Sequence, residues 1–167
     1  MFTSFFGQDD IVTGEDKQQI LYYLHFPVKL SGRWNLSLRR NGPQGPEICK
    51  IHKGGWSNSF SIYWDTGAET PCQNVGNFRV HYEFPASSER YRWDPDGLIM
   101  TDYHYSLYKA AELELPRTQR TLIARWRTSV GSFTKDGRLE LNPQYTHELE
   151  LILATALGLE ERCRERR

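Results

Sequence analysis

The residues whose types and spacing best suit catalysis are Asp102 and His104, in the run TDYHYSLY. In an extended strand, residues two positions apart point to the same face, so this carboxylate and this imidazole would lie side by side. Such a pair suits general-base catalysis on a nucleophile from elsewhere, for which the candidates are Cys49, Cys72 and Ser106. No spacing in the sequence brings these groups together, and the chain has no GxSxG, HExxH, GxGxxG or P-loop motif. We therefore favour a protein that is not an enzyme, and keep a small cofactor-free hydrolase or isomerase as the alternative.

Basic side chains on predicted strands form the second set of candidate functional residues. If alternating members share a face, they can hold a phosphorylated headgroup through charge-assisted hydrogen bonds. The predicted ligand-binding residues are Arg39, Arg40, Lys50, Lys53, Arg125 and Arg127. The alternative is that these cations are solvated and paired with the 21 acidic residues of the chain.

Metal binding is a weaker prediction, although four histidines also lie in predicted strands. Strand histidines with a nearby carboxylate are common metal ligands in barrels. The chain has no HxH pair, however, and its three cysteines are too few and too scattered for a short-spaced zinc site or a disulfide framework. We expect no metal, no cofactor, and free thiols in a reducing compartment.

Length and charge limit the class of protein. The 167 residues are enough for one domain, residues 1–167, with a sizeable core. Basic and acidic residues balance at 21 each, so no overall field attracts nucleic acid, and we expect no nucleic-acid partner. The start, MFTSFFGQDD, lacks the basic and apolar regions of a signal peptide. We expect a cytoplasmic protein, peripheral at membranes if an anionic lipid is its ligand.

The elements that would position these residues are mostly short strands, which fill residues 1–141. Aromatic and β-branched runs alternate with turn sequences such as DPDG and KDG. The predicted strands are 20–26, 34–40, 47–53, 60–64, 78–84, 90–94, 98–108, 121–127 and 138–141. Two longer polar connections, 65–77 and 110–120, could cap the fold or carry a protein partner.

The last part of the chain predicts a helix over about 143–164. Asn142 and Pro143 are a typical helix start, and residues 149–159 are apolar on nearly every side. The apolar stretch would be roughly 16 Å long, about half a bilayer core, so we expect no transmembrane segment. A helix without a polar face must be enclosed by protein. This predicts an all-β fold, a closed or near-closed antiparallel barrel of about 10–12 strands around a central apolar helix. The alternative is an amphipathic helix lying on a sheet.

This pattern of strands and helix resembles the tubby C-terminal domain and its relatives, the LURP-one-like proteins and the phospholipid scramblases. More specifically, it looks like a family of small fungal proteins thought to be tubby-like. The matching segments are ILYYLHFP (20–27), WNLSLRR (34–40), RYRW (90–93), LIARWRTS (122–129), DGRLEL (136–141) and LELILATALGLEERCRERR (149–167). The resemblance implies a tubby-like barrel and, because tubby binds phosphoinositides, an anionic phospholipid ligand. The basic pair of tubby has no residue-by-residue match in this chain.

Together these features predict a non-enzymatic binding protein. Its expected ligand is an anionic phospholipid headgroup or a small apolar molecule at a barrel end. The alternatives are the small enzyme using Asp102 and His104, and a protein–protein adaptor that binds through loops 65–77 and 110–120.

Overall fold

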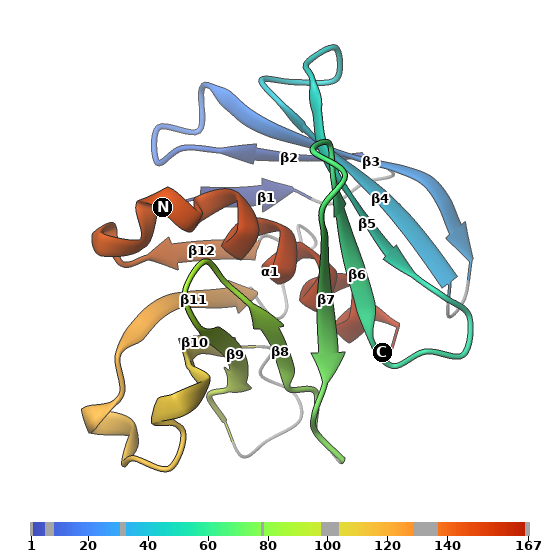
Figure 1. Ribbon diagram of the computed structural model, residues 1–167. Helices are drawn as coiled ribbons and strands as arrows, with labels where there is room; N and C mark the ends of the chain where they lie inside the picture. The colour runs from blue at the N-terminus through green and yellow to red at the C-terminus, as the bar shows by residue number, and fades with distance from the viewer. Residues whose placement is uncertain are drawn as a thin grey trace.

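An antiparallel arrangement of strands and one C-terminal helix make up the computed structural model (Figure 1), which describes residues 2–5, 9–30, 33–77, 79–97, 104–128 and 137–165. The strands are β1 (Phe2–Phe5), β2 (Asp9–Thr13), β3 (Ile20–Leu30), β4 (Arg33–Arg40), β5 (Glu47–Lys53), β6 (Phe60–Trp64), β7 (Glu69–Asn74), β8 (Tyr82–Pro85), β9 (Arg90–Pro95), β10 (His104–Lys109), β11 (Leu122–Thr128) and β12 (Gly137–Leu141). The helix is α1 (Leu149–Arg164). The predicted all-β fold with a single C-terminal helix is confirmed.

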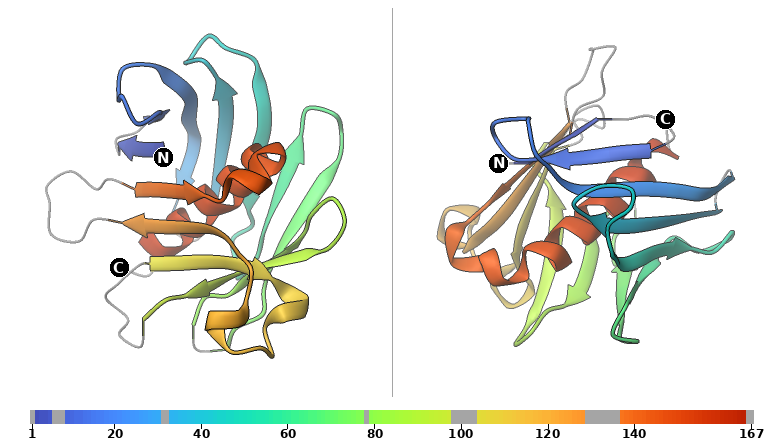
Figure 2. Two further views of the ribbon diagram at one scale, coloured as in Figure 1. Left: turned by 90° about the vertical axis from the view of Figure 1, so that its left-hand side faces the viewer. Right: turned by 90° about the horizontal axis from the view of Figure 1, so that it is seen from above.

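Strand order follows chain order. From β2 to β12, each strand pairs antiparallel with the next one, and the short strand β1 pairs with β2 on one side and with β12 on the other. Two perpendicular views show the strands curving around α1, which runs between them (Figure 2). The helix axis therefore lies where the inward-facing side chains of the strands converge.

Helix α1 begins at Leu149, later than the predicted helix start at about 143, and is buried along most of its length. The Asn142 side chain accepts a hydrogen bond from the backbone N–H of Gln144 at 3.1 Å and opens a 3₁₀ turn, η3 (Pro143–Glu148), that leads into α1. Every residue from 152 to 161 is buried. The prediction of an enclosed helix is thus confirmed, and the alternative of an amphipathic helix with a solvent-facing side is wrong.

The core is formed by alternate strand residues packed against α1. Its largest fully buried side chains include Trp34, Trp93 and Trp126, which come from three different strands. Burying a large aliphatic side chain stabilises a protein by about 1.5–3 kcal/mol, so the Leu and Ile residues of α1 together contribute on the order of 10 kcal/mol before chain entropy is counted. The helix is therefore part of the core and holds the strands at fixed positions around it.

The structure differs from the sequence prediction in several parts of the chain; the predicted strand 78–84, for example, begins only at Tyr82, the first residue of β8. Strands β1 and β2 were not expected, and the segment 65–77 contains strand β7 rather than one long loop. The sequence of β7, ETPCQN, has few of the residues that favour strands, so pairing with β6 and β8 decides its conformation. The segment 110–120 contains two 3₁₀ turns, η1 (Ala110–Glu112) and η2 (Arg117–Gln119). The first part of the predicted strand 98–108, which includes Asp102, lies outside the described residues.

Candidate functional site

The outer surface of β10 and β11 carries the strongest candidate site. Tyr105 and Leu107 of β10 belong to the core, so the alternate residues of that strand, His104, Ser106 and Tyr108, face outward. In the neighbouring strand β11, Trp126 is buried in the core, and the residues on either side of it, Arg125 and Arg127, face outward in the same way. The pleat of two paired strands therefore brings these five outward side chains onto one surface.

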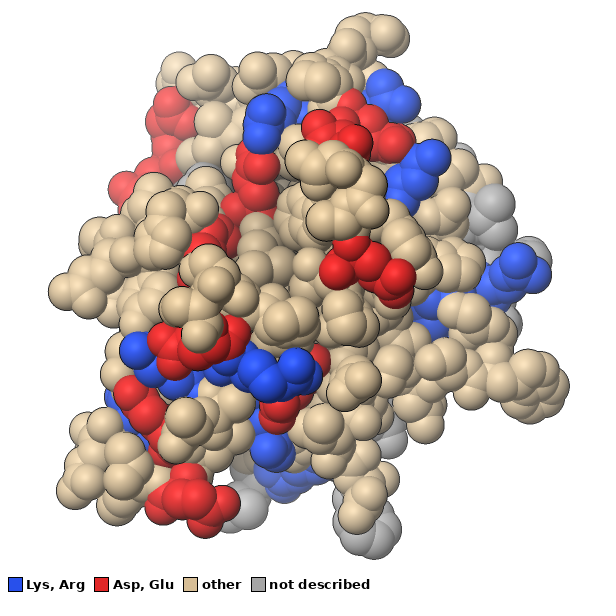
Figure 3. Space-filling model, viewed as in Figure 1, with Lys and Arg blue, Asp and Glu red and all other residues tan. Residues whose placement is uncertain are grey.

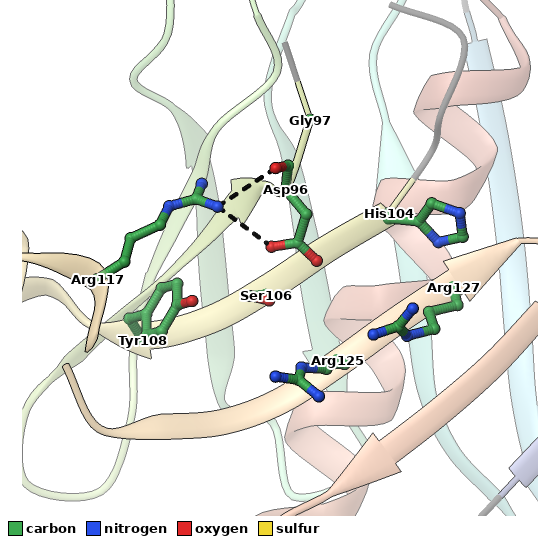
Figure 4. Close-up of a pocket in the computed structure, with 8 residues that line it drawn as sticks. All are labelled: Asp96, Gly97, His104, Ser106, Tyr108, Arg117, Arg125 and Arg127. Carbon is green, nitrogen blue, oxygen red and sulfur yellow. Dashed lines mark hydrogen bonds and ion pairs between the residues drawn. The ribbon is translucent and has the colours of Figure 1, made fainter. Parts of the chain in front are cut away.

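These side chains line a pocket of about 400 Å³ (Figure 4). Asp96 and Gly97, which follow β9, complete one wall, and Arg117 from η2 reaches in from the segment after β10. The backbone N–H of Asp96 donates a hydrogen bond to the carbonyl oxygen of His104 at 2.9 Å, which joins the two walls. Among the described residues that line the pocket, three arginines face a single carboxylate, so these side chains carry a net positive charge.

Arg125 and Arg127 are the chemically significant members of the pocket. Neither forms an ion pair or hydrogen bond with another described residue, and Figure 4 draws none for them. Glu140 lies opposite Arg125 on β12, but its carboxylate pairs with Arg138 at 3.3 Å instead. Arg127 in turn lies opposite Arg138 on β12 and opposite His104 on β10. Like charges that face each other across strands are destabilising, so this arrangement is not explained by stability.

Arg117 is held in place by the end of β9. Its guanidinium donates to the carbonyl oxygen of Pro95 at 2.6 Å and to that of Asp96 at 3.4 Å, and it lies 3.6 Å from the Asp96 carboxylate. The neighbouring Arg120 lies over the ring of Tyr108, at 5.5 Å from the ring centre. Together these contacts fix the 110–120 segment along the rim of the pocket.

The buried acid nearest this surface is already neutralised. Asp94 lies opposite Ser106 and is bonded to His81 Nδ1 at 2.7 Å and to Arg92 Nε at 3.1 Å, with Arg120 at 3.6 Å. Burial opposes the ionised form of Asp94, but the hydrogen bond from His81 and the nearby positive charges outweigh it and lower the pKa of the carboxyl. Asp94 therefore anchors the basic residues around it without leaving a free negative charge beneath the pocket.

His104 supplies a polar group that no described residue binds. The Nδ1 atom of His104 is buried and has no hydrogen-bond partner among the described residues. The proposed catalytic partner of His104, Asp102, lies outside the described residues. The other candidate nucleophiles, Cys49 and Cys72, are buried in the core, and burial raises the pKa of both thiols. The described residues thus provide binding groups here, without an activated nucleophile.

The remaining predicted basic residues lie away from this pocket and have partners of their own. Arg40 makes a bidentate pair with Glu150, and Lys50 lies 3.6 Å from Glu47. Lys53, which is 2% exposed, lies 3.5 Å from Glu165. The fourth, Arg39, donates a hydrogen bond to the Pro43 carbonyl oxygen at 3.2 Å. The pocket therefore contains Arg125 and Arg127 from the predicted set, together with Arg117, which is not one of the six predicted ligand-binding residues.

The wider surface shows why unpaired arginines stand out. On the face drawn in Figure 3, several Lys and Arg side chains lie next to Asp or Glu side chains.

Within the described ranges, no group of three or more His, Cys, Asp or Glu side chains is arranged to hold a metal ion. No helix in the described part of the chain is long and apolar enough to cross a membrane.

Comparison with known proteins gives no relative from which a function could be transferred. No protein-family model, no curated protein and no solved structure matches this chain. The function must therefore be argued from the chemistry of the pocket on β10 and β11.

Proposed function

We propose that this protein is a non-enzymatic binding protein that holds the phosphate groups of an anionic phospholipid headgroup in the pocket on β10 and β11. One observation carries the proposal: Arg125 and Arg127 line the same pocket, and neither has an acidic partner in the described part of the chain. Unpaired cations that repel a neighbour are expected where a ligand supplies the missing negative charge.

The groups in the pocket match the chemistry of a phosphate ligand. A guanidinium presents a planar fork of N–H donors that bonds phosphate oxygens in pairs. Arg125 and Arg127 are two residues apart on β11, so both forks face outward from one strand, and the free Nδ1 of His104 provides a further polar contact. The volume of about 400 Å³ falls within the usual range for small-ligand sites.

The other expected ligand, a small apolar molecule, is less well supported. Helix α1 and the inward side chains of the strands occupy the interior of the sheet, and the pocket on β10 and β11 is lined mainly by charged and polar groups. The adaptor alternative is also weaker, because the segments 65–77 and 110–120 each expose one large apolar side chain, Val75 and Leu115. Single exposed apolar residues are common on monomeric proteins.

We also infer that the strands form a tubby-like barrel closed through β1. The pairing of β1 with both β2 and β12 supports a closed sheet, and the position of α1 between the strands supports the arrangement that the tubby-like resemblance implies. The proposal for the ligand does not depend on this architecture, because the pocket belongs to β10, β11 and the segments next to them.

Binding to vesicles tests the proposed function. Phosphatidylcholine vesicles with and without a phosphatidylinositol bisphosphate would be sedimented with the wild type and with the double variant R125Q/R127Q. The matched control R39Q/R90Q removes the same charge from other surface positions. A charge-assisted hydrogen bond contributes about 1.5–3 kcal/mol, so each arginine lost should weaken binding roughly 10- to 100-fold.

Four results would support or contradict the pocket. Selective loss of binding in R125Q/R127Q, with near-normal binding in R39Q/R90Q, supports it. Wild-type binding should also fall as salt screens the phosphate contacts. Equal weakening by both double variants would mean that binding depends on overall charge, and the assignment to this pocket would be wrong. Free inositol trisphosphate, titrated calorimetrically, should show the same preference without a membrane.

A further inference from the structure

Trp56 is far more exposed to solvent than the other four tryptophans. Its relative exposure is 104%, so its indole makes almost no contact with the rest of the chain, whereas Trp34, Trp93 and Trp126 are at most 1% exposed. Leaving a side chain of this size in water forgoes about 1.5–3 kcal/mol of burial. A contact outside the chain would recover that energy.

The residues around Trp56 are small and uncharged. The connection between β5 and β6, residues 54–59, reads GGWSNS, and we refer to it as the tryptophan hairpin. A Cβ atom added to Gly54 or Gly55 would meet nothing within 4 Å, so the tip stands clear of the rest of the protein. Because it has no charge to desolvate, this tip can enter a less polar environment at little cost.

The tryptophan hairpin lies at the same end of the sheet as part of the pocket. Successive strands alternate in direction, so the β5–β6 connection, the start of β10 and the end of β11 share one end. His104 at the start of β10 and Arg127 near the end of β11 lie at this end. Helix α1 ends there as well, because Arg162 Nη2 donates to Asn58 Oδ1 at 2.8 Å. Figure 1 shows the C-terminus next to the β5–β6 connection.

We propose that the tryptophan hairpin is a membrane anchor that inserts Trp56 into the interface of an anionic bilayer, with the end of the sheet where α1 terminates facing the lipid. The identity of the lipid surface rests on the proposed function of the pocket. The hairpin joins β5 to β6, and the pocket lies on β10 and β11, five strands further along the ladder; the hairpin and the His104 and Arg127 side of the pocket are both at this end of the sheet.

A membrane fits the tryptophan hairpin better than a protein partner does. Indole rings concentrate at the membrane–water interface, because the ring is apolar and its N–H can still reach water. An aromatic anchor in a protein interface is instead surrounded by further contact surface that excludes water. The neighbours of Trp56 in the hairpin are two glycines, two serines and an asparagine, which offer little such surface.

Fluorescence quenching by brominated lipid tests the anchor directly. Vesicles of phosphatidylcholine with brominated tails and a minor fraction of phosphatidylinositol bisphosphate should shift wild-type emission to the blue and quench it. Trp34, Trp93 and Trp126 are shielded in the core, and the half-buried Trp64 ends β6 at the opposite end of the sheet from the hairpin, so the variant W56F should bind the same vesicles without quenching. The variant W56S should bind them roughly tenfold or more weakly. Wild-type binding without any quenching would overturn the anchor.

The outcomes separate the anchor from the pocket. Binding of free inositol trisphosphate reports on the pocket alone, so W56S should match the wild type, while R125Q/R127Q should lose binding. If the free headgroup binds normally but brominated lipid never quenches Trp56, the anchor is wrong and the proposed function stands. If quenching persists in R125Q/R127Q at wild-type affinity, the pocket is wrong and the anchor stands. Protection of Trp56 by a protein, with no response to vesicles, would contradict the membrane as partner.

Discussion

Gly158 of α1 lies directly against the ring of Phe60 at the start of β6. A Cβ atom at position 158 would stand 2.5 Å from both Cε2 and Cζ of that ring, closer than such contacts occur. The helix and the strand therefore approach each other as closely as they do only because position 158 has no side chain. This contact links the central helix to the strand that follows the tryptophan hairpin.

The close approach predicts that Gly158→Val destabilises the protein by about 1–3 kcal/mol or more, because three added carbons must displace a buried ring. Urea unfolding followed by circular dichroism measures the change. Gly55→Val is the matched control, since nothing lies within 4 Å of that position, and it should be nearly neutral. If Gly158→Val has the stability of the wild type, the helix does not pack against β6 as described.

A buried hydrogen bond also fixes α1 against β9. The Trp93 indole N–H donates to the Thr155 hydroxyl at 3.0 Å, and both side chains are fully buried. Thr155→Val keeps the shape but leaves the indole N–H without an acceptor, which should cost about 1–3 kcal/mol. Combining it with Trp93→Phe in a double-mutant cycle should give a coupling energy well above zero in thermal or urea unfolding. Simple additivity of the two substitutions would mean that the bond contributes nothing.

The lowered pKa of Glu148 predicts that the free energy of unfolding falls in acid. Burial favours the protonated form, but hydrogen bonds from Tyr91 and Ser87 outweigh it and lower the pKa of Glu148. A carboxyl whose pKa is lower in the folded state stabilises the protein fully above the unfolded pKa of about 4.3. This stabilisation is lost as the pH falls through the folded pKa. Glu148→Gln should therefore destabilise the protein by about 1 kcal/mol at neutral pH.

The same variant should lose its disadvantage in acid, where the wild-type carboxyl is also protonated. Unfolding free energies of the wild type and Glu148→Gln, measured from pH 7 down to about pH 3, should converge. The exposed residue Glu114 provides the control, since Glu114→Gln should run parallel to the wild type over the whole range. A constant difference between wild type and Glu148→Gln would mean that the charge of Glu148 is not stabilising.

Asp94 should control the order of the 110–120 segment. Asp94→Asn removes the charge that faces Arg92 and Arg120, and hydrogen bonds to charged groups contribute about 1.5–3 kcal/mol. We expect faster tryptic cleavage after Arg117 and Arg120 in the native protein, measured by mass spectrometry of the first fragments. The exposed Glu69 gives the control variant Glu69→Gln, which should be cut at the wild-type rate. Unchanged cleavage in Asp94→Asn would show that other contacts hold the segment.

Arg127 should lower the stability of the unliganded protein. It faces Arg138 across β11 and β12, and like charges in such pairs destabilise by about 0.2–1 kcal/mol. Arg127→Gln should therefore raise the unfolding free energy by a few tenths of a kcal/mol at low salt. The gain should disappear at high salt, where the repulsion is screened. The control Arg90→Gln removes a residue paired with Glu83 at 2.6 Å and should bring no gain. A loss of stability in Arg127→Gln would remove the argument that this position is kept for binding.

Much of the strand framework follows from local sequence. The predicted strands 47–53 and 60–64 agree with β5 and β6 at both ends, because each is rich in apolar or aromatic residues and is bounded by residues typical of turns, Pro46 and Gly54 for β5 and Ser59 and Asp65 for β6. The sequence of β7 has few residues that favour strands, and pairing with β6 and β8 supplies what local sequence does not. Strands β1 and β2 do contain Phe, Ile, Val and Thr, but they are only 4 and 5 residues long, and pairing with each other and with β12 and β3 defines them.

The candidate site was predictable in part. Arg125 and Arg127 alternate along a recognisable strand, so the sequence alone selects them as outward-facing cations. The same reasoning selected Arg40 and Lys53, whose partners Glu150 and Glu165 lie more than 100 residues away in the chain. Arg117 could not be selected, because it lies in an irregular segment whose position depends on contacts with Pro95 and Asp96.

The sequence by itself determined that residues 149–159 must be enclosed, because a helix without a polar side cannot face water. It determined the all-β class in the same way, through the alternation of side chains along the strands. Only the tertiary structure decided which cations are neutralised and which remain unpaired. Ion pairs depend on distances of a few ångströms between groups remote in the chain, and no local pattern encodes these. Among the described residues, tertiary pairing gives Arg40 and Lys53 acidic partners and gives Arg125 and Arg127 none.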